Sequence, residues 1–331
     1  MHNHISVLID DPSQVGEARR TAMAIANEAN LSDVDAGKLS IITTELATNI
    51  LKHAKHGEIL IGNVRGEGVV DVIALDQGPG FADFEHSMQD GVSTAGTAGQ
   101  GLGAVRRQSS AFEVYSKPGA GTVVISTLGQ PPRNAAKFEV GVICRPVKGE
   151  IDCGDGWATG QTISKQQIML VDGLGHGTDA YTAAYKAMIV FGEYAKHGPT
   201  ELLNFAHMAL RPTRGAALAM ADIDFEKGTV RYAGVGNIAA TIIDNGNTRS
   251  LVSHNGTVGA EMRKVQEFTY PWNAESILVM NSDGLTTHWR IDPYPGLQMK
   301  SPLMMAAVLY RDFKRTRDDS TVLVARERRA A

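Results

Sequence analysis

IMLVDGLGHG, residues 168–177, is the stretch from which the fold can best be inferred. An apolar run ends at Asp172, and glycines follow at positions 173, 175 and 177, with His176 between the last two. A strand that stops at a carboxylate and turns through glycines presents that carboxylate at a sheet edge, with room beside it for a hard divalent cation. Asp-Gly is also a common turn, so a plain strand-to-helix connection stays open as an alternative.

Three further aspartates lie in similar settings near predicted strand ends. Asp155 lies in CGDGWAT, read as a glycine turn before a strand, Asp283 follows a predicted buried strand at residues 275–281, and Asp318 begins DDST before the last strand. Two like charges about 4 Å apart repel by roughly 4 kcal/mol at an effective dielectric of about 20. If the four carboxylates converge, bound metal is the natural compensation; if they do not, they are independent turn residues.

The bulk properties limit the function classes. The 331 residues suggest about two domains, and the net charge of −4 gives no basic footprint for nucleic acid. The N-terminus lacks signal-peptide features, and no apolar run approaches the roughly 20 residues that span a bilayer. Cys144 and Cys153 are too few for a disulfide framework. We therefore expect a soluble, cytoplasmic protein that binds neither nucleic acid nor membrane.

The first part of the chain predicts two amphipathic helices, over residues 11–30 and 33–53, after a short strand. On the second helix, Glu45, Asn49 and His53 are spaced four residues apart, so their side chains stack on one face. A solvated polar edge would show the same spacing, so the pattern alone does not establish a site.

A predicted strand hairpin, residues 58–63 and 69–75, leads to Asp76 in DQGPGF. The glycine-rich stretch 90–103 follows, and residues 101–109 read as a helix. Backbone N–H groups in such a loop, together with a helix N-terminus, favour a bound anion. The loop is not a Walker A motif, because no GK[ST] follows it.

Together these motifs resemble the GHKL ATPase family, and most closely its small bacterial serine-kinase branch of anti-sigma-factor kinases and the stressosome switch kinase. The resemblance covers residues 1–130 and implies ATP as cofactor, with Asn49 as a ligand of its Mg²⁺. It implies Glu45 as the general base toward a serine hydroxyl or water, and Asp76 as the partner of the adenine amino group. The remaining implied ATP-binding residues are Gly78 and Gly80 at the pocket floor, Gly99, Gly101, Leu102 and Gly103 in the lid over the phosphates, and Thr122 at the adenine end.

In residues 138–331, the predicted strands and helices follow one another in a different order from those of residues 1–130. Helices are predicted at residues 181–197, 199–210 and 301–313, and GVGN at 234–237 and NTRS at 247–250 are read as turns between strands.

The motif order GDxW, DGxGHG, RGAAL, GVGN, SDG and DDxT resembles the metal-dependent PPM-type serine/threonine phosphatases of the SpoIIE branch, in particular the short stressosome feedback phosphatase. By that resemblance, Asp172 bridges two Mn²⁺ or Mg²⁺ ions, and the carbonyl of Gly173 is a ligand of one. Asp283 and Asp318 hold the other ion, and Asp155 orients a water that the metals activate for in-line attack on phosphorus.

Two residues depart from the pattern of the phosphatase family. Cys153 stands where many family members have glycine, and His176 lies four residues after Asp172, whereas the eukaryotic phosphatases have a histidine two residues after theirs. A loop-packing and a substrate-facing role for His176 therefore both stay open. Arg145 and Arg214 are candidates for holding phosphate, with surface arginines as the alternative.

The sequence thus predicts an α/β chain of two domains: a GHKL α/β sandwich at residues 1–130, a linker at 131–137 and a PPM-type αββα sandwich at 138–331. The predicted function is a bifunctional regulator of a bacterial partner-switching pathway, whose kinase and phosphatase domains act on STAS-domain anti-sigma antagonists or stressosome scaffolds. A sigma factor or a downstream phosphatase is a further candidate partner, and a homodimer is an open alternative. The alternative function is a phosphatase whose N-terminal domain is an ATP-gated module that binds a partner or sigma factor.

Overall fold

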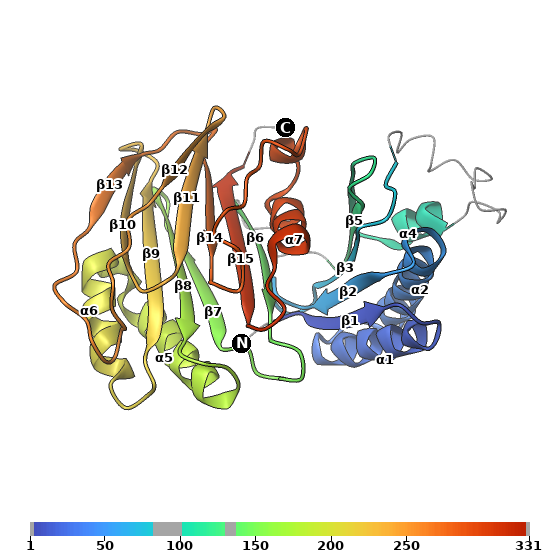
Figure 1. Cartoon of the computed structure of the whole chain (residues 1–331), viewed down its shortest axis with the longest axis horizontal. Coiled ribbons are helices and arrows are strands. Elements are labelled where there is room, and N and C mark those ends of the chain that lie inside the picture. Colours follow the sequence, from blue (N-terminus) through green and yellow to red (C-terminus); the bar gives the residue numbers. More distant parts are fainter. Residues whose placement is uncertain (1–2, 82–100, 130–136, 329–331) are drawn as a thin grey trace. The chain divides into compact units, whose positions relative to one another are not determined.

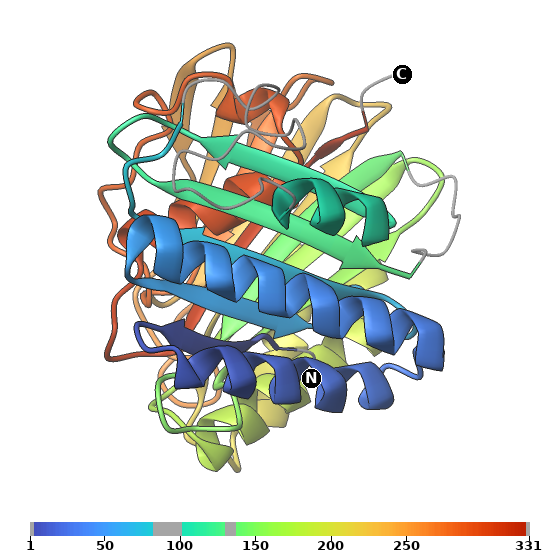
Figure 2. The ribbon, with the colours of Figure 1, turned by 90° about the vertical axis from the view of Figure 1, so that its right-hand side faces the viewer.

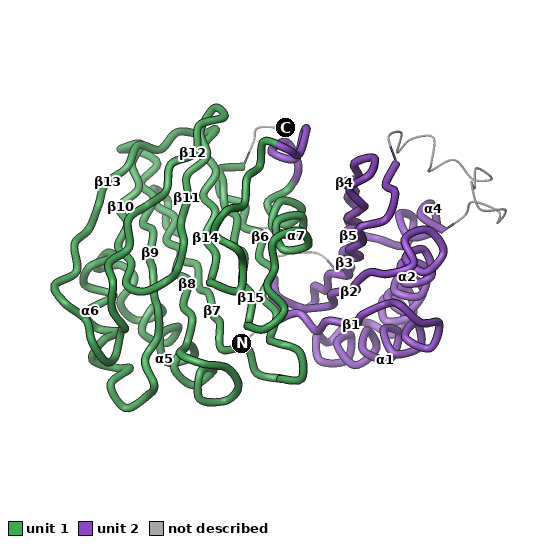
Figure 3. Tube along the Cα trace, in the orientation of Figure 1, with its two compact units in different colours: residues 1, 135–292, 301–331 green, residues 2–134, 293–300 purple. Residues whose placement is uncertain are grey.

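The computed structural model of the chain describes residues 3–81, 101–129 and 137–328 (Figure 1). The chain forms two compact units (Figure 3): one comprises His2–Asn134 and Pro293–Lys300, and the other comprises Met1, Ala135–Asp292 and Ser301–Ala331. Gly99, the adjoining part of the glycine-rich stretch and linker residues 131–136 lie outside the described residues. Among the helices that are described, none combines the length and hydropathy that crossing a bilayer requires.

The N-terminal unit is a five-stranded antiparallel sheet covered on one face by helices (Figure 2). The strand order is β1-β2-β3-β5-β4. The strands are β1 (Ile5–Ile9), β2 (Gly57–Gly62), β3 (Val70–Asp76), β4 (Ala111–Ser116) and β5 (Thr122–Leu128). The helices are α1 (Ser13–Glu28), α2 (Asp33–Asn49) and α4 (Gly101–Gln108).

Helix α2 carries two of the predicted site residues, and both of its ends have a local cause. The Ser32 hydroxyl caps its N-terminus by accepting from the Asp35 backbone N–H at 3.2 Å, and Asp33 adds negative charge at the positive end of the helix dipole. Directly after Asn49 the chain widens into a π-helical turn, Ile50–Ala54. The helix predicted to run to residue 53 is therefore α-helical only to Asn49, and π-turns of this kind occur often at functional sites.

The C-terminal unit has two five-stranded antiparallel sheets, of order β13-β10-β9-β8-β7 and β12-β11-β14-β15-β6. The first sheet comprises β7 (Asp155–Gln161), β8 (Lys165–Gly173), β9 (Ala216–Asp224), β10 (Thr229–Val235) and β13 (Phe268–Pro271). The second comprises β6 (Phe138–Arg145), β11 (Ala239–Asp244), β12 (Asn247–Ser250), β14 (Ile277–Asn281) and β15 (Ser320–Glu327).

Helices cover the outer faces of these two sheets and give four layers, α-β-β-α (Figure 1). Helices α5 (Thr178–Tyr194) and α6 (Pro199–Leu210) pack on the first sheet, and α7 (Pro302–Phe313) packs on β6 and β15 of the second. Gly141 on β6 lets α7 approach closely, because a Cβ there would lie 2.0 Å from the Leu303 nitrogen. The predicted fold class, an α/β sandwich ATPase domain followed by an αββα sandwich, is confirmed.

Two local predictions differ from the structure. Residues 247–250, predicted as a turn, form strand β12, and the reverse turn lies at Asn245–Gly246, whose φ angles of 47° and 80° are those of an Asn-Gly hairpin turn. Asp155, predicted in a glycine turn, is instead the first residue of β7 and pairs with Asp172 of β8. The ladder between β7 and β8 therefore begins at Asp155 itself, where a turn was predicted.

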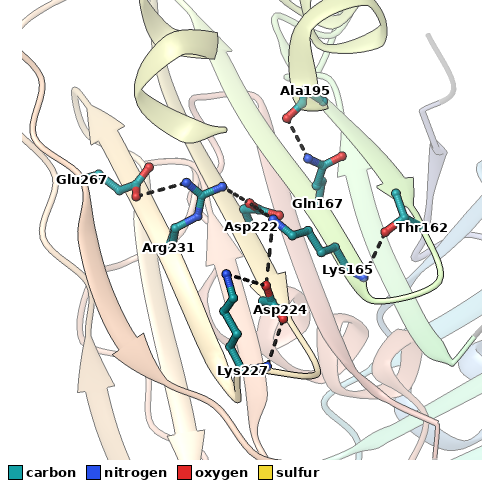
Figure 4. Close-up of polar contacts among 9 residues, drawn as sticks. All are labelled: Thr162, Lys165, Gln167, Ala195, Asp222, Asp224, Lys227, Arg231 and Glu267. Atoms are coloured by element: carbon teal, nitrogen blue, oxygen red, sulfur yellow. Dashed lines mark hydrogen bonds and ion pairs between the residues drawn. The ribbon is translucent and has the colours of Figure 1, made fainter. Parts of the chain in front are cut away.

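A buried ion-pair cluster lies at the end of the first sheet opposite Asp172 (Figure 4). Asp222 on β9 is 1% exposed, and its carboxylate accepts from the Arg231 guanidinium on β10 and from Lys165 Nζ on β8 at 3.4 Å. Arg231 also lies 3.5 Å from Glu267, just before β13. The cluster therefore ties four neighbouring segments of the sheet together.

Arg231→Met is expected to lower the free energy of unfolding by about 3 kcal/mol, because it leaves Asp222 buried with Lys165 as a more distant partner. Lys227→Met is the matched control: its ammonium is 3.7 Å from Asp224, but its side chain is 76% exposed, so its loss should change stability by no more than about 0.5 kcal/mol. Urea unfolding of both variants measures the difference. Equal effects would show that the cluster does not stabilise the sheet.

Candidate functional site

Glu45 and Asn49 lie half-buried on one face of α2, beside the start of α4. A Cβ at Gly101 would lie 3.3 Å from both Glu45 Oε2 and Asn49 Oδ1, so the backbone of Gly101 passes close to both groups. The first N–H groups of a helix have no partner within that helix and favour a negatively charged ligand. The structure therefore brings a carboxylate, an amide oxygen and a helix N-terminus together.

Asp76 lies at the end of β3, where it pairs with Thr122 of β5 across the sheet. Its Oδ1 accepts from the backbone N–H of Gly78 at 2.8 Å and of Thr122 at 3.3 Å. These bonds fix the rotation of the carboxylate, and they bring together Asp76 and Thr122, predicted at the adenine end, with Gly78, predicted at the pocket floor.

The loop after β3 packs backbone against backbone, which explains its glycines. A Cβ at Gly78 would lie 2.7 Å from the Ala54 Cβ, and one at Gly80, whose φ is +61°, would lie 2.3 Å from the Lys117 carbonyl oxygen. Gly121, which the sequence did not single out within PGAGT, is more constrained: its φ is +81°, and a Cβ would lie 2.0 Å from the Asp76 carbonyl oxygen. Of the residues predicted for the lid, Leu102 packs on the core formed with α1 and α2, and Gly103 is buried.

Gly121→Ala is expected to weaken ATP binding at least tenfold and to destabilise the protein, because the new methyl group must displace the backbone of Asp76. Gly119→Ala is the matched control in the same turn: its φ is +74°, yet nothing lies within 4 Å of a Cβ there. It carries only the conformational cost of about 1 kcal/mol for alanine at positive φ. Titration with a fluorescent ATP analogue measures both variants, and equal affinities would contradict this account of the loop.

At the other site, the four predicted aspartates lie at neighbouring strand ends of the two C-terminal sheets. Asp155 and Asp172 face each other as cross-strand partners on β7 and β8, while Asp283 follows β14 and Asp318 precedes β15. The fully buried Ser282 links the sheets: its hydroxyl donates to Asp155 Oδ2 at 2.6 Å and accepts from the Thr321 backbone N–H at 3.0 Å.

The carboxylates of this site are also held by other donors. Asp283 Oδ2 accepts from Asn237 Nδ2 at 2.7 Å, and Asp318 Oδ1 accepts from the Asp319 backbone N–H at 2.9 Å. Within residues 3–81, 101–129 and 137–328, no three His, Cys, Asp or Glu side chains stand ready-made to hold a metal ion.

Asp319, the second aspartate of DDST, has a structural role that the sequence did not reveal. It is 3% exposed, and its two oxygens accept from the backbone N–H groups of Val147 at 2.7 Å and Gly154 at 2.8 Å. A Cβ at Gly154 would lie 2.7 Å from Asp319 Oδ2, so this position requires glycine. Asp319 thus holds the loop that leads into Asp155. Its partners are more than 160 residues away in the sequence, and no local pattern marks them.

The electrostatics of the aspartates test whether a cation suits them. Burial raises the pKa of Asp155 to about 8, and burial together with the charges of Asp155, Asp283 and Asp318 raises the pKa of Asp172 to about 9. Burial and the charge of Asp283 likewise raise the pKa of Asp318. These carboxyl groups resist ionising together, and carboxylate oxygens are the ligands that Mg²⁺ and Mn²⁺ prefer. The donor set therefore fits divalent cations.

The residues that the sequence left without a role lie around this site. His176 Nδ1 is 3.0 Å from Glu150 Oε1, and Arg214 pairs with Asp179 at 2.6 Å, both at the surface, whereas Arg145 is buried on β6.

The two cysteines are buried free thiols near the same site. Their sulfur atoms, Cys144 Sγ and Cys153 Sγ, lie 3.7 Å apart. Hydrogen bonding to Cys144 and burial raise the pKa of the Cys153 thiol, so it stays protonated and unreactive.

Comparison with known proteins finds a different family in each half of the chain. The histidine kinase-like ATPase domain model matches residues 8–127, and the model of stage II sporulation protein E (SpoIIE) matches residues 164–328. Serine/threonine-protein kinase RsbT of Bacillus subtilis (strain 168) is 36% identical over 126 residues, which are 38% of this chain and 95% of RsbT. Phosphoserine phosphatase RsbX of the same organism is 22% identical over 139 residues, which are 42% of this chain and 70% of RsbX.

Solved structures show the same likeness. A chain from a study titled "The bacterial stressosome: a modular system that has been adapted to control secondary messenger signaling" aligns with a TM-score of 0.55 and 26% identity, covering 58% of this chain and all of that one. RsbX in complex with magnesium aligns with a TM-score of 0.52 and 19% identity, covering 59% of this chain and 98% of RsbX, which shows a shared fold.

Fold, sites and relatives together define an enzyme that joins a serine/threonine-kinase-type ATPase domain to a PPM-type serine/threonine phosphatase domain. ATPase domains of this type bind ATP, and PPM phosphatases use Mn²⁺ or Mg²⁺. The chain belongs to the histidine kinase-like ATPase family, in the branch of RsbT, and carries a SpoIIE-type phosphatase domain in the same polypeptide. The resemblance predicted from the sequence is confirmed in both halves.

Proposed function

We propose that this chain both adds and removes phosphate on serine residues of STAS-domain anti-sigma antagonists or stressosome scaffolds. The observation that carries the proposal is the presence of two complete residue sets in one chain, one around Glu45 and Asn49 and the other around Asp172. The names of the relatives support opposite reactions, since RsbT is a protein kinase and RsbX a phosphoserine phosphatase. The stressosome structure supports a partner-switching setting.

In the kinase half, residues 1–130 by our division, ATP supplies the phosphoryl group. The amide oxygen of Asn49 would hold the Mg²⁺ that accompanies it, and the N-terminus of α4 would face the phosphates. Glu45 lies beside the same helix start and would accept the proton of the attacking serine hydroxyl. Asp76 would accept from the adenine amino group, with Thr122 at the same end and Gly78 and Gly80 at the pocket floor, while Gly101, Leu102 and Gly103 would form part of the lid.

In the phosphatase half, residues 138–331, Asp172 and the Gly173 carbonyl, together with Asp283 and Asp318, would hold two divalent ions. When bound, such ions supply a nucleophile that is active at neutral pH and offset the charge of the phosphate. Asp155, whose Oδ2 accepts from Ser282, would accept a hydrogen bond from the attacking group and so orient it. The buried Asp319 keeps Asp155 in place through the preceding loop.

Separate variants test the two halves. With ATP and Mg²⁺, Glu45→Ala is expected to reduce phosphotransfer to a purified STAS protein at least 100-fold while retaining ATP affinity, because the general base is lost but the nucleotide contacts remain. With Mn²⁺, Asp172→Asn is expected to reduce phosphate release from the phosphorylated STAS protein at least 100-fold, because it removes the charge of a proposed metal ligand. Radiolabelled ATP and a phosphate-release assay measure the two reactions.

Glu17→Ala and Asp244→Asn, the latter at the far end of β11, are matched controls that lie away from the proposed catalytic residues, and each should retain activity. If the wild-type protein releases phosphate but transfers none from ATP, and if Glu45→Ala changes neither result, the N-terminal domain is an ATP-gated binding module and not a kinase. A wild-type protein with neither activity would overturn the proposal.

A further inference from the structure

The GVGN sequence, residues 234–237, resembles a motif of the phosphatase family, but the resemblance implies no chemical role for its residues. Asn237 is exposed, follows β10 in the first sheet, and donates from Nδ2 to Asp283 Oδ2 at 2.7 Å. Asp283 follows β14 in the second sheet, 46 residues further along the chain. Asn237 lies in the connection between β10 of the first sheet and β11 of the second, and its side-chain amide contacts Asp283 at the end where the aspartates gather.

The backbone before Asn237 explains why the amide reaches this position. Gly236 has φ +96°, and a Cβ there would lie 2.4 Å from the Ala217 Cβ, so the turn lies directly against β9. Ala217 is the cross-strand partner of Asp172. The Gly236 N–H also donates to the His254 carbonyl oxygen at 2.9 Å, which fixes the turn from its other side. Asn237 is therefore held at the level of Asp172 while its side chain reaches Asp283.

We propose that Asn237 is a positioning residue that orients the carboxylate of Asp283 for divalent metal binding, and this inference rests on the proposed phosphatase function. A carboxylate with one oxygen held by an amide donor has already lost much of its rotational freedom. Binding a cation therefore costs it less conformational entropy. Because the glycine before Asn237 packs on Ala217, the cross-strand partner of Asp172, Asn237 also holds Asp283 close to a ligand from the first sheet. Loss of such outer-shell partners typically costs about 10–100-fold in metal affinity.

The test is a calorimetric titration of the full chain with Mn²⁺ alone. Asn237→Ala is expected to weaken one Mn²⁺-binding event about 10–100-fold, and to raise by the same factor the Mn²⁺ concentration that gives half-maximal phosphate release. Asn247→Ala, an exposed asparagine on the edge strand β12, is the matched control and should bind as wild type does. The melting temperature of Asn237→Ala in EDTA should equal that of wild type, because the side chain is at the surface.

A double-mutant cycle separates positioning from a general structural effect. If Asn237 acts through Asp283, adding Asn237→Ala to Asp283→Asn should not weaken Mn²⁺ binding further. Additive losses in the cycle, or unchanged Mn²⁺ affinity in Asn237→Ala, would overturn the inference and leave the proposed function standing. A wild-type protein that binds no Mn²⁺ and releases no phosphate would overturn the proposed function itself.

Discussion

The mutual repulsion of the aspartates at one end of the αββα sandwich is the constraint on which the phosphatase site depends. Asp155 and Asp172 are direct cross-strand partners, and Asp283 and Asp318 come from adjacent strands of the second sheet. Such a group stays together only if other contacts hold its backbone and if protons or cations neutralise its charge. Ser282, Asn237 and Asp319 provide these contacts, each linking segments that are far apart in the sequence.

The ATPase half meets a different constraint, the close approach of backbone segments. Its glycines at positions 78, 80 and 121 allow the loop after β3 to lie directly against the turn between β4 and β5, and this contact holds Asp76 beside Thr122. Gly101 has the same role at the other end of the site, where the start of α4 meets Glu45 and Asn49. The ATPase half therefore shapes its site with glycines, which have no side chain, whereas the phosphatase half gathers charged aspartates.

Local sequence patterns predicted the residues that each strand or helix presents, but not the partners that hold them. Asp172 and Asp283 were found because a strand that ends in a carboxylate and glycine leaves a local trace. Asp319 and Ser282 were missed as site residues because their partners are chosen by the packing of two sheets. Residues 247–250 were read as a turn because Asn and Ser favour turns, whereas the Asn245–Gly246 turn placed them in a strand. The π-turn after Asn49 likewise left no pattern distinct from a continuing helix.

Proton release on Mn²⁺ binding is the most direct test of this account of the metal site. The raised pKa values of about 8 for Asp155 and about 9 for Asp172 mean that both carboxyl groups are largely protonated at pH 7, whereas the proposed site needs Asp172 ionised as a ligand and Asp155 ionised to accept a hydrogen bond. Calorimetry at pH 7 in two buffers of different ionisation enthalpy should therefore show release of about two protons per chain, declining as the pH rises through 9, with Mn²⁺ affinity increasing over the same range. Mn²⁺ binding without proton release at pH 7 would contradict the account.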